Sequence, residues 1–293
     1  MAMVDMARVE PLEDVTDLLE EPERLREKAE EEGLLFFRGL LDPKTVSDVR
    51  SQVLAVCDAH GWLVEGTDPK AAVANQDAMV VESRDPRWQD FYCDIQKVRD
   101  FHALALEPAI LNAFETLFGE PVLPHSRNIC RVVFPNSSVH STPPHQDNLY
   151  IGGSEQTWTA WIPVGDVPVT LGGLAVTKGT HKEGKLEDKE AVGAGGRRVD
   201  VEEDVVWVGG DYSCGDVIFL HSLTVHQGRD NLSDRLRLSF DFRYQPRSHR
   251  VRSDSLLPHM GWVTWDEVYS EWEEDDLTKY YWRGWELDVF ERQ

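Results

Sequence analysis

The spacing of apolar residues over about the first 120 positions is typical of helices. Pro43, directly after Asp42, predicts the start of one helix, because proline is tolerated at the first helical position. Pro108 is expected to interrupt another. The apolar run Leu34–Arg38 is typical of a short strand, whereas residues 65–85 show no clear period. The predicted helical segments are residues 12–32, about 42–60 and about 85–118.

After Pro121 the pattern changes to short apolar segments bounded by Gly, Pro, Asn and Asp. That spacing predicts an all-β barrel or sandwich. No repeat or low-complexity linker divides the chain, so we expect one domain over residues 1–293. It would comprise a helical part to about residue 120, a β core over 121–245 and an aromatic-rich covering segment over 246–293. The predicted strands are Ile129–Phe134, Thr157–Val164, Leu174–Thr177, Asp216–Leu220 and Arg235–Tyr244.

The last of these strands alternates strictly between apolar and polar residues. Side chains two residues apart share a face of a strand, so the two kinds of residue separate onto opposite faces. The apolar face is expected to pack on the N-terminal helices. The polar face could point to water or into a wet interior, and only the second position would allow it to bind a ligand. The apolar face carries Leu236, Leu238, Phe240 and Phe242, and the polar face carries Arg237, Ser239, Asp241 and Arg243.

The composition disfavours nucleic acids and membranes as partners. The 293 residues include 53 acidic and 30 basic side chains, a net charge of −23, which disfavours binding to nucleic acid or to an anionic membrane surface. No stretch approaches the roughly 18 apolar residues that a membrane-spanning helix needs. The four cysteines are widely separated and are expected to be reduced thiols in a cytoplasmic protein. The sequence pattern does not indicate whether the protein is a monomer or an oligomer.

Candidate chemistry begins with His145 and Asp147 near the start of the β region. On a strand, these two side chains would point the same way. A turn with a capping aspartate is an equally good interpretation of this motif alone. Two imidazoles and one carboxylate on one face of a metal leave three positions open, the pattern of non-haem Fe(II) oxygenases. Two later residues, His221 and His226, are candidates for the second imidazole.

A second candidate site lies on the polar face of the last strand. Arg237 and Ser239 place a guanidinium fork beside a hydroxyl, a suitable receptor for a carboxylate. Taken alone, Arg237 could equally form a surface ion pair on an edge strand. Arg235, two residues earlier, is the next candidate for the same role.

Together these segments resemble the phytanoyl-CoA dioxygenase-like family of Fe(II)- and 2-oxoglutarate-dependent oxygenases. The resemblance covers roughly residues 120–245 and implies a double-stranded β-helix, or jelly-roll barrel, supported by the N-terminal helices. Several blocks in the same order are far more specific than any one of them. The matching segments are Pro144–Asp147, Trp161–Asp166, Leu171–Val176, Gly179–Lys182, Gly215–Phe219, His226–Gly228, Asn231–Arg235 and Arg237–Ser239.

The resemblance also implies roles for single residues. His145, Asp147 and His226 would hold Fe(II), which favours His226 over His221 as the second imidazole. An aspartate at position 147 is typical of hydroxylases, because related halogenases carry Gly or Ala there. The residues that would bind 2-oxoglutarate are Arg237 and Ser239, at its C5 carboxylate, and Trp161 beside it.

Substrate contacts are expected from residues near the metal and from loops. In the inferred fold Asn128, Arg131 and Tyr150 lie nearest to the metal, whereas the tail aromatics are expected to pack on the core. The predicted function is hydroxylation, or another oxidation with O₂, of a C–H bond in a metabolic or natural-product small molecule. The alternatives are a catalytically silent jelly-roll binding protein and a cupin-like metal enzyme that does not use 2-oxoglutarate. The candidate lid segments are residues 65–85, 148–156 and 183–212.

Overall fold

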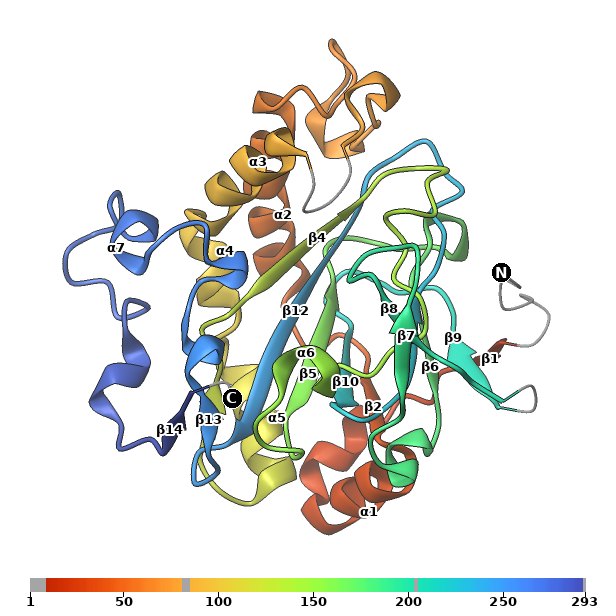
Figure 1. Ribbon diagram of the computed structural model, residues 1–293, viewed down its shortest axis with the longest axis vertical. Coiled ribbons are helices and arrows are strands. Elements are labelled where there is room, and N and C mark those ends of the chain that lie inside the picture. Colours follow the sequence, from red (N-terminus) through yellow and green to blue (C-terminus); the bar gives the residue numbers. More distant parts are fainter. Residues whose placement is uncertain (1–8, 81–84, 203–204, 292–293) are drawn as a thin grey trace.

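Two β-sheets face each other at the centre of the computed structural model, which describes residues 9–80, 85–202 and 205–291 (Figure 1). The major sheet has the strand order β2-β10-β5-β12-β3, and β4 pairs with β12 on the same edge as β3. Its strands are β2 (Leu34–Phe37), β3 (Val122–Pro124), β4 (Ile129–Val133), β5 (Trp158–Pro163), β10 (Val217–His221) and β12 (Arg237–Pro246).

The minor sheet is shorter and has the order β1-β9-β6-β11. Two further strand pairs lie outside both sheets, β7 with β8 and β13 with β14. The minor strands are β1 (Val9–Pro11), β6 (Leu174–Thr177), β9 (Trp207–Gly209) and β11 (His226–Gly228), and the additional strands are β7 (Asp188–Glu190), β8 (Arg197–Val199), β13 (Val251–Arg252) and β14 (Val289–Phe290).

Strand alternation divides the side chains of the major sheet between two apolar layers. On β2, Leu35 and Phe37 belong to the layer against the N-terminal helices, whereas Leu34 and Phe36 belong to the layer between the two sheets. The apolar face of β12 lies in the helix-side layer, as predicted, with Phe240 against Phe101 at 4.9 Å between ring centroids. Every residue of β12 is buried, so its polar face points into the interior and not to water.

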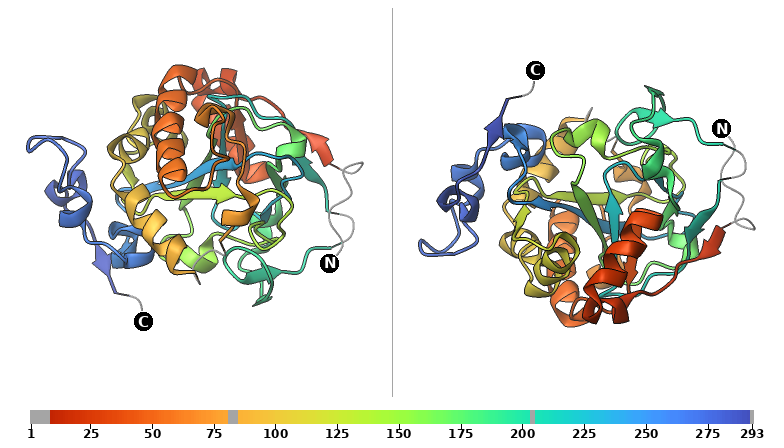
Figure 2. Two further views of the ribbon diagram at one scale, coloured as in Figure 1. Left: turned by 90° about the horizontal axis from the view of Figure 1, so that it is seen from above. Right: turned by 90° about the horizontal axis from the view of Figure 1, so that it is seen from below.

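The helices of the N-terminal part lie along the outer face of the major sheet (Figures 1 and 2). Asp42 caps α2 by accepting hydrogen bonds from the amides of Lys44 and Thr45, at 3.3 and 3.1 Å, and Pro108 begins α5. The helices are α1 (Pro22–Glu32), α2 (Pro43–Ala59), α3 (Pro86–Gln96), α4 (Arg99–Leu104), α5 (Pro108–Phe118), α6 (Asn148–Ile151) and α7 (Trp265–Val268), and shorter 3-10 turns connect other segments.

The segment from about residue 85 to 118, which is predicted to form two helices, forms three helices. The additional break falls between α3 and α4, where side chains satisfy the last carbonyls of α3. His102 Nε2 donates to the carbonyl of Gln96 at 2.9 Å, and Trp272 Nε1 donates to that of Lys97 at 2.9 Å. Trp272 comes from the distant tail, so local spacing alone could not predict the break.

The C-terminal segment packs beside the major sheet, away from the minor sheet and the N-terminus (Figure 2). Its aromatic residues form a cluster with Leu123 and Val251, which confirms the prediction that they pack on the core. Within the described residues, no helix is long and apolar enough to span a bilayer. All four cysteines are free thiols.

The prediction of a mainly β jelly roll supported by N-terminal helices is confirmed, with one refinement. The two sheets remain separate hydrogen-bonded units and do not close into a continuous barrel within the described residues. An isolated β-bridge between His145 and His226 extends the minor sheet beyond β11. This bridge brings two candidate ligands together at the edge of the minor sheet.

Candidate metal centre and adjoining cavity

Two histidines face each other across the isolated bridge. The amide of His145 donates to the carbonyl of His226 at 3.0 Å, and the reciprocal bond is 3.1 Å. Each ring is also fixed through its Nδ1 atom, which lies 2.9 Å from the carbonyl of Pro143 for His145 and 3.0 Å from that of Thr224 for His226. A carbonyl can only accept, so each Nδ1 carries a proton, and Nε2 is the ring nitrogen of each histidine that is available to a metal.

Asp147 completes the group from the turn that follows His145. Its Oδ2 accepts a hydrogen bond from Thr159 Oγ1 at 2.5 Å, and its Oδ1 lies 3.2 Å from Arg243 Nη2. Burial alone would raise the pKa of Asp147, but Arg243 and the two imidazoles outweigh burial and hold that pKa well below its usual range. The carboxylate is therefore ionised and oriented.

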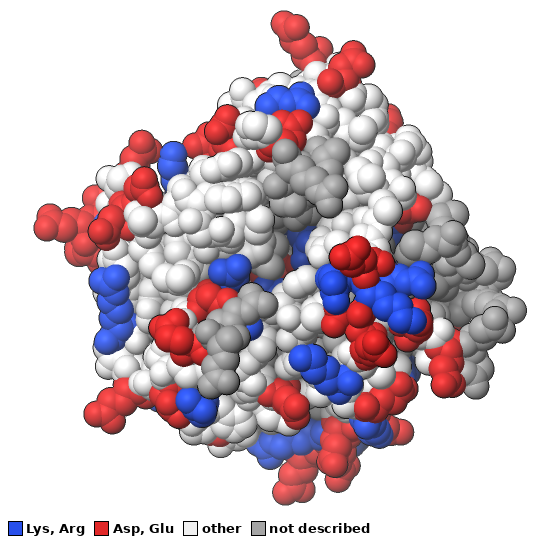
Figure 3. Space-filling view, in the orientation of Figure 1, with Lys and Arg blue, Asp and Glu red and all other residues white. Residues whose placement is uncertain are grey.

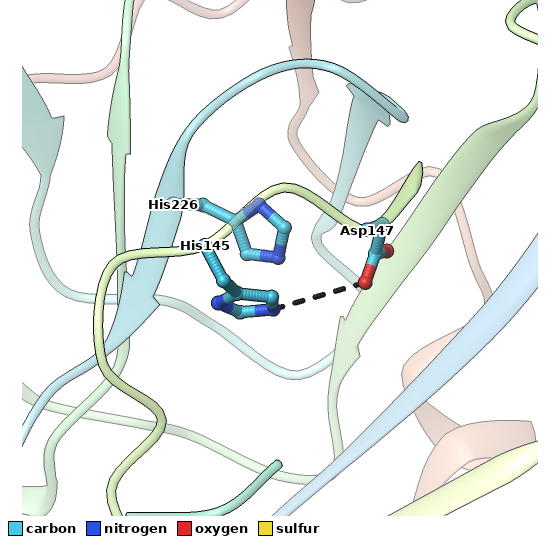
Figure 4. A group of neighbouring side chains, drawn as sticks. All are labelled: His145, Asp147 and His226. Atoms are coloured by element: carbon cyan, nitrogen blue, oxygen red, sulfur yellow. Dashed lines mark ion pairs between the residues drawn. The ribbon is translucent and has the colours of Figure 1, made fainter. Parts of the chain in front are cut away.

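The three side chains converge on one point (Figure 4). One ligand atom from each of His145, Asp147 and His226 lies within 4.8 Å of the other two, and all three residues are buried. Burial, with His226 beside it, lowers the pKa of His145 to about 3, so its imidazole is neutral at neutral pH. Two imidazole nitrogens and one carboxylate oxygen fit a divalent transition metal such as Fe(II).

The local structure of this motif differs from the expectation of a strand. Only His145 makes a β-bridge, and Asp147 is the residue before the short helix α6. It occupies the N-cap position, but its side chain caps no amide of that helix. Gln146 between them donates to the carbonyls of Gly184 and Leu223, at 2.9 and 2.7 Å, and so fixes the motif against two other segments.

His221 lies at the end of β10 and takes no part in this group. Its ring contacts Trp158 and His181, and its Nδ1 accepts from the amide of Leu223 at 3.2 Å. Within the described residues, the cluster with metal-binding spacing contains His226 and not His221.

Two polar residues of β12, Arg237 and Asp241, line the same cleft. Arg237 and Trp161 line it together with the three candidate ligands. Arg237 Nη1 donates to Ser239 Oγ at 2.5 Å, whereas the buried Nε has no hydrogen-bond partner. Burial lowers the pKa of Arg237 to about 10, which leaves it cationic at neutral pH. A buried cation with an unpaired donor fits one carboxylate of 2-oxoglutarate.

Three sequence expectations about β12 can now be compared with the structure. The interpretation of Arg237 as a surface ion pair is wrong, because its exposed fraction is 3%. Arg235, named as the next candidate, is unsuitable because it precedes β12, points outward and lies 3.6 Å from Asp234. Ser239 does not line the cleft itself, and its hydroxyl accepts a hydrogen bond from Arg237, which does.

A cavity of about 580 Å³ adjoins the cleft and is lined by Arg131 and Tyr150, two of the three predicted substrate contacts. Asn128 is not among its lining residues. Instead it is buried, its Nδ2 lies 3.2 Å from His102 Nδ1, and its carbonyl accepts from Gln96. Asn128 therefore lies outside the wall of this cavity, unlike the other two predicted substrate contacts.

Two of the three predicted lid segments reach this cavity. Residues 149–151 and 191–196 line it, and Tyr150 Oη donates to the carbonyl of Gly195 at 3.3 Å to join them. The described part of residues 65–85 contributes no lining residue. Residues 81–84 and 203–204 of the predicted lids lie outside the described residues.

Sequence reasoning did not identify the partners of Asp147. Thr159 and Arg243 stand opposite each other on β5 and β12 and both contact the Asp147 carboxylate. The alternation of β12 placed Arg243 on the polar face, but no local signal marks Thr159.

Both the sequence and the fold of this chain match those of known proteins. The sequence model of the phytanoyl-CoA dioxygenase (PhyH) family matches residues 29–239. Two relatives, the 1-deoxypentalenic acid 11-beta-hydroxylases of Streptomyces arenae and Streptomyces exfoliatus, are each 30% identical to this chain. The alignments span 260 and 261 residues, 84% of this chain and 88% of each relative.

Solved structures share the fold. The non-heme alpha ketoglutarate dependent carbocyclase SnoK from nogalamycin biosynthesis superposes with a TM-score of 0.55 at 21% identity, covering 79% of this chain and 87% of SnoK. The corresponding epimerase SnoN gives 0.54 at 22% identity, covering 79% and 85%.

Proposed function

The chain belongs to the phytanoyl-CoA dioxygenase family of Fe(II)- and 2-oxoglutarate-dependent enzymes, and we propose that it hydroxylates a C–H bond of a small natural product at an iron held by His145, Asp147 and His226. The two curated relatives support this choice of reaction, because both are named as hydroxylases of 1-deoxypentalenic acid. The observation that carries the site assignment is the convergence of two anchored imidazoles and one ionised carboxylate.

The residues around these ligands would set their geometry. Both Nδ1 atoms are tied to backbone carbonyls, so both Nε2 atoms stay directed at the metal. Thr159 and Arg243 hold the Asp147 carboxylate from two strands of the major sheet. The ligand set therefore needs little rearrangement to bind Fe(II).

Arg237 would receive the C5 carboxylate of 2-oxoglutarate, with Ser239 fixing the guanidinium and Trp161 forming a wall of the cleft. When bound, iron supplies the activation of O₂ and the oxidation of the C–H bond, with conversion of 2-oxoglutarate to succinate and CO₂. One oxygen atom enters the substrate as a hydroxyl group and the other enters succinate, so the reaction balances without a further reductant. The buried walls of the cleft would exclude bulk water from it.

An anaerobic titration tests this function directly. Fe(II) and 2-oxoglutarate are added to the metal-free protein alone and together, and binding is followed by calorimetry and by the visible absorption of the iron chelate. We expect 2-oxoglutarate to bind much more tightly when Fe(II) is present, and succinate to form once O₂ is admitted with a substrate. Failure to bind Fe(II), or binding of 2-oxoglutarate that does not depend on Fe(II), would contradict the proposal.

A further inference from the structure

The cavity beside the proposed iron site has four arginines in its wall. Arg131 and Thr142 line both the cleft and the cavity, so the two spaces adjoin at these residues. The volume of about 580 Å³ suits a ligand of the size of a small natural product. The arginines in its wall are Arg127, Arg131, Arg243 and Arg252, and the larger apolar residues are Ile129, Val139, Leu149, Ile151, Val192 and Met260.

Three of these four arginines are neutralised by carboxylates of the protein. The pairs are Arg131 with Asp241 at 2.7 Å, Arg243 with Asp147 at 3.2 Å and Arg252 with Asp254 at 2.5 Å. Each of these guanidinium groups therefore serves to orient a group of the protein. Their charges leave no excess for a ligand.

Arg127 differs from the other three. Its Nη1 donates to the backbone carbonyl of Asp254 at 3.2 Å, and it forms no salt bridge with any carboxylate in the described part of the chain. The side chain of Asp254 is already paired with Arg252. Arg127 is half-buried, and burial lowers the pKa of its guanidinium below the ordinary value. Arg127 is therefore a partly desolvated positive charge with no carboxylate of its own, since the Asp254 carboxylate that acts on it at longer range is paired with Arg252.

This positive charge stands out against the acidic surface of the molecule. The chain carries a net charge of −23, and acidic side chains project around much of the face seen in Figure 3. Basic atoms lie at the base of the hollow near the centre of that face. A cation kept inside a hollow of an acidic protein favours an anionic ligand over a cationic one.

A buried nitrogen without a hydrogen-bond partner in the described residues, His125 Nδ1, lies in the same wall. His125 is buried and lines the cavity, and its Nε2 lies 2.9 Å from Gln245 Oε1. The amide nitrogen of Gln245 donates to the carbonyl of His249 at 3.0 Å, which fixes Oε1 as the acceptor toward His125. His125 Nδ1 is then an acceptor, and no group of the described residues donates to it. It could accept a hydrogen bond from a hydroxyl group of a ligand or from water.

We infer that the cavity binds a small, largely apolar carboxylic acid, with its carboxylate on Arg127 and the C–H bond to be oxidised at the Arg131 end. This inference rests on the proposed function, because it identifies the cavity as the substrate site of that reaction. One unpaired cation matches one negative charge, so a monoanion fits better than a polyphosphorylated thioester. Arg127 is thus assigned as a specificity-determining residue, remote from the metal ligands.

The test compares acids with their uncharged counterparts. Cyclic carboxylic acids of about ten to sixteen carbons, and the methyl ester of each, are bound to the anaerobic Fe(II)- and 2-oxoglutarate-loaded protein and measured by calorimetry. We expect the better acids to bind about tenfold or more tightly than their esters, because the charge-assisted bonds to Arg127 are lost in the ester. Arg127→Met should remove this preference by weakening acid binding while ester binding stays within about twofold. Arg127→Lys, which keeps the charge but loses the fork, should retain part of it.

Arg247→Met provides a matched control. Arg247 is also half-buried, stacks on Trp285 at 5.0 Å and lies outside the cavity wall, and its loss changes the net charge by the same amount. Its acid preference should equal that of the wild type. The inference is wrong if no acid binds more tightly than its ester, or if Arg127→Met keeps the preference. Binding of Fe(II) and 2-oxoglutarate on the same samples separates the two proposals, because a protein that binds neither disproves the proposed function itself.

Discussion

The cleft with the candidate iron ligands and the cavity beside it are built in different ways. The cleft takes its side chains mainly from the two sheets, and Asp147, one of two aspartates in its wall, has partners on both carboxylate oxygens. The cavity takes much of its wall from connecting segments, including residues 149–151 and 191–196. In its wall Arg127 has no carboxylate partner among the described residues, and two buried atoms, His125 Nδ1 and Arg243 Nε, have no hydrogen-bond partner there. The fold thus fixes the chemistry in its rigid part and leaves ligand selection to loops.

This contrast implies that the two regions can be disabled separately. Changes in the cleft should alter binding of Fe(II) or 2-oxoglutarate and leave the acid preference of the cavity intact. Changes at Arg127 should do the reverse. A variant that damages both regions equally would indicate loss of the fold and not of a site.

The largest effect is expected at the metal ligands. Asp147→Ala and His145→Ala should each weaken Fe(II) binding by more than about 100-fold, because each removes one of three protein donors. The fold should persist, since the apolar layer between the major sheet and the helices contains no residue of the cleft wall. Anaerobic calorimetry measures the metal affinity, and circular dichroism checks the fold. Wild-type turnover by either variant would contradict the ligand assignment.

The next effect concerns the cosubstrate. Arg237→Lys keeps the positive charge but loses the planar fork, and it should weaken 2-oxoglutarate binding by roughly 30- to 150-fold, or about 2–3 kcal/mol. The Fe(II) affinity should stay close to that of the wild type. The dissociation constant of 2-oxoglutarate in the anaerobic Fe(II) protein is the measurement. A change below about threefold would remove Arg237 from the site.

A smaller effect is expected from the residue that orients Asp147. Thr159→Val removes the hydroxyl that donates to Asp147 Oδ2 and should weaken Fe(II) binding by about tenfold. Thr157→Val is a matched control, because Thr157 is also buried but its hydroxyl donates to the carbonyl of Ser154. Equal Fe(II) affinities for the two variants would show that Thr159 does not position the ligand.

Two buried histidines outside the metal cluster, His102 and His125, are expected to lower the free energy of unfolding moderately in acid. Burial lowers the pKa of His102 and of His125 from the ordinary 6.5 to about 4. Each is neutral when folded and binds a proton once unfolded, so the free energy of unfolding should fall as the pH drops through 6.5 toward 4. Between pH 7.5 and 5.5 each of the two histidines should lower the free energy of unfolding by about 1.4 kcal/mol.

Urea unfolding at several pH values measures this slope. His102→Phe should reduce the change in the free energy of unfolding between pH 7.5 and 5.5 by the contribution of one histidine. This holds whatever effect the substitution has on stability at neutral pH. An unchanged slope would show that His102 is not kept neutral by burial.

Much of the cleft could be predicted from the sequence because its residues follow regular local rules. Alternation along residues 235–244 placed Arg237 on the polar face, and the order of motifs associated His226 with His145 and Asp147. The interior position of that polar face could not be predicted locally. It depends on whether a second sheet covers β12, and only the tertiary structure decides that.

The cavity was predicted less well, for physical reasons that particular residues illustrate. Ile129 lines the cavity, whereas the side chain of its neighbour Asn128 points the other way and contacts the buried His102. Successive side chains point in opposite directions, so a shift of one residue in the sequence decides whether a side chain reaches the cavity or the core. Arg127 became a candidate only when the carboxylate partners of the other arginines were known. Such pairings join residues that are as much as 110 positions apart.

The measurement that tests the central claim most directly is Fe(II) binding by the pair His226→Ala and His221→Ala. Both histidines are buried and lie five residues apart, but only His226 shares the metal-binding cluster with His145 and Asp147. Anaerobic titration should show that His226→Ala loses Fe(II) binding, while His221→Ala stays within about threefold of the wild type. Retained binding in His226→Ala, with loss in His221→Ala, would contradict the account.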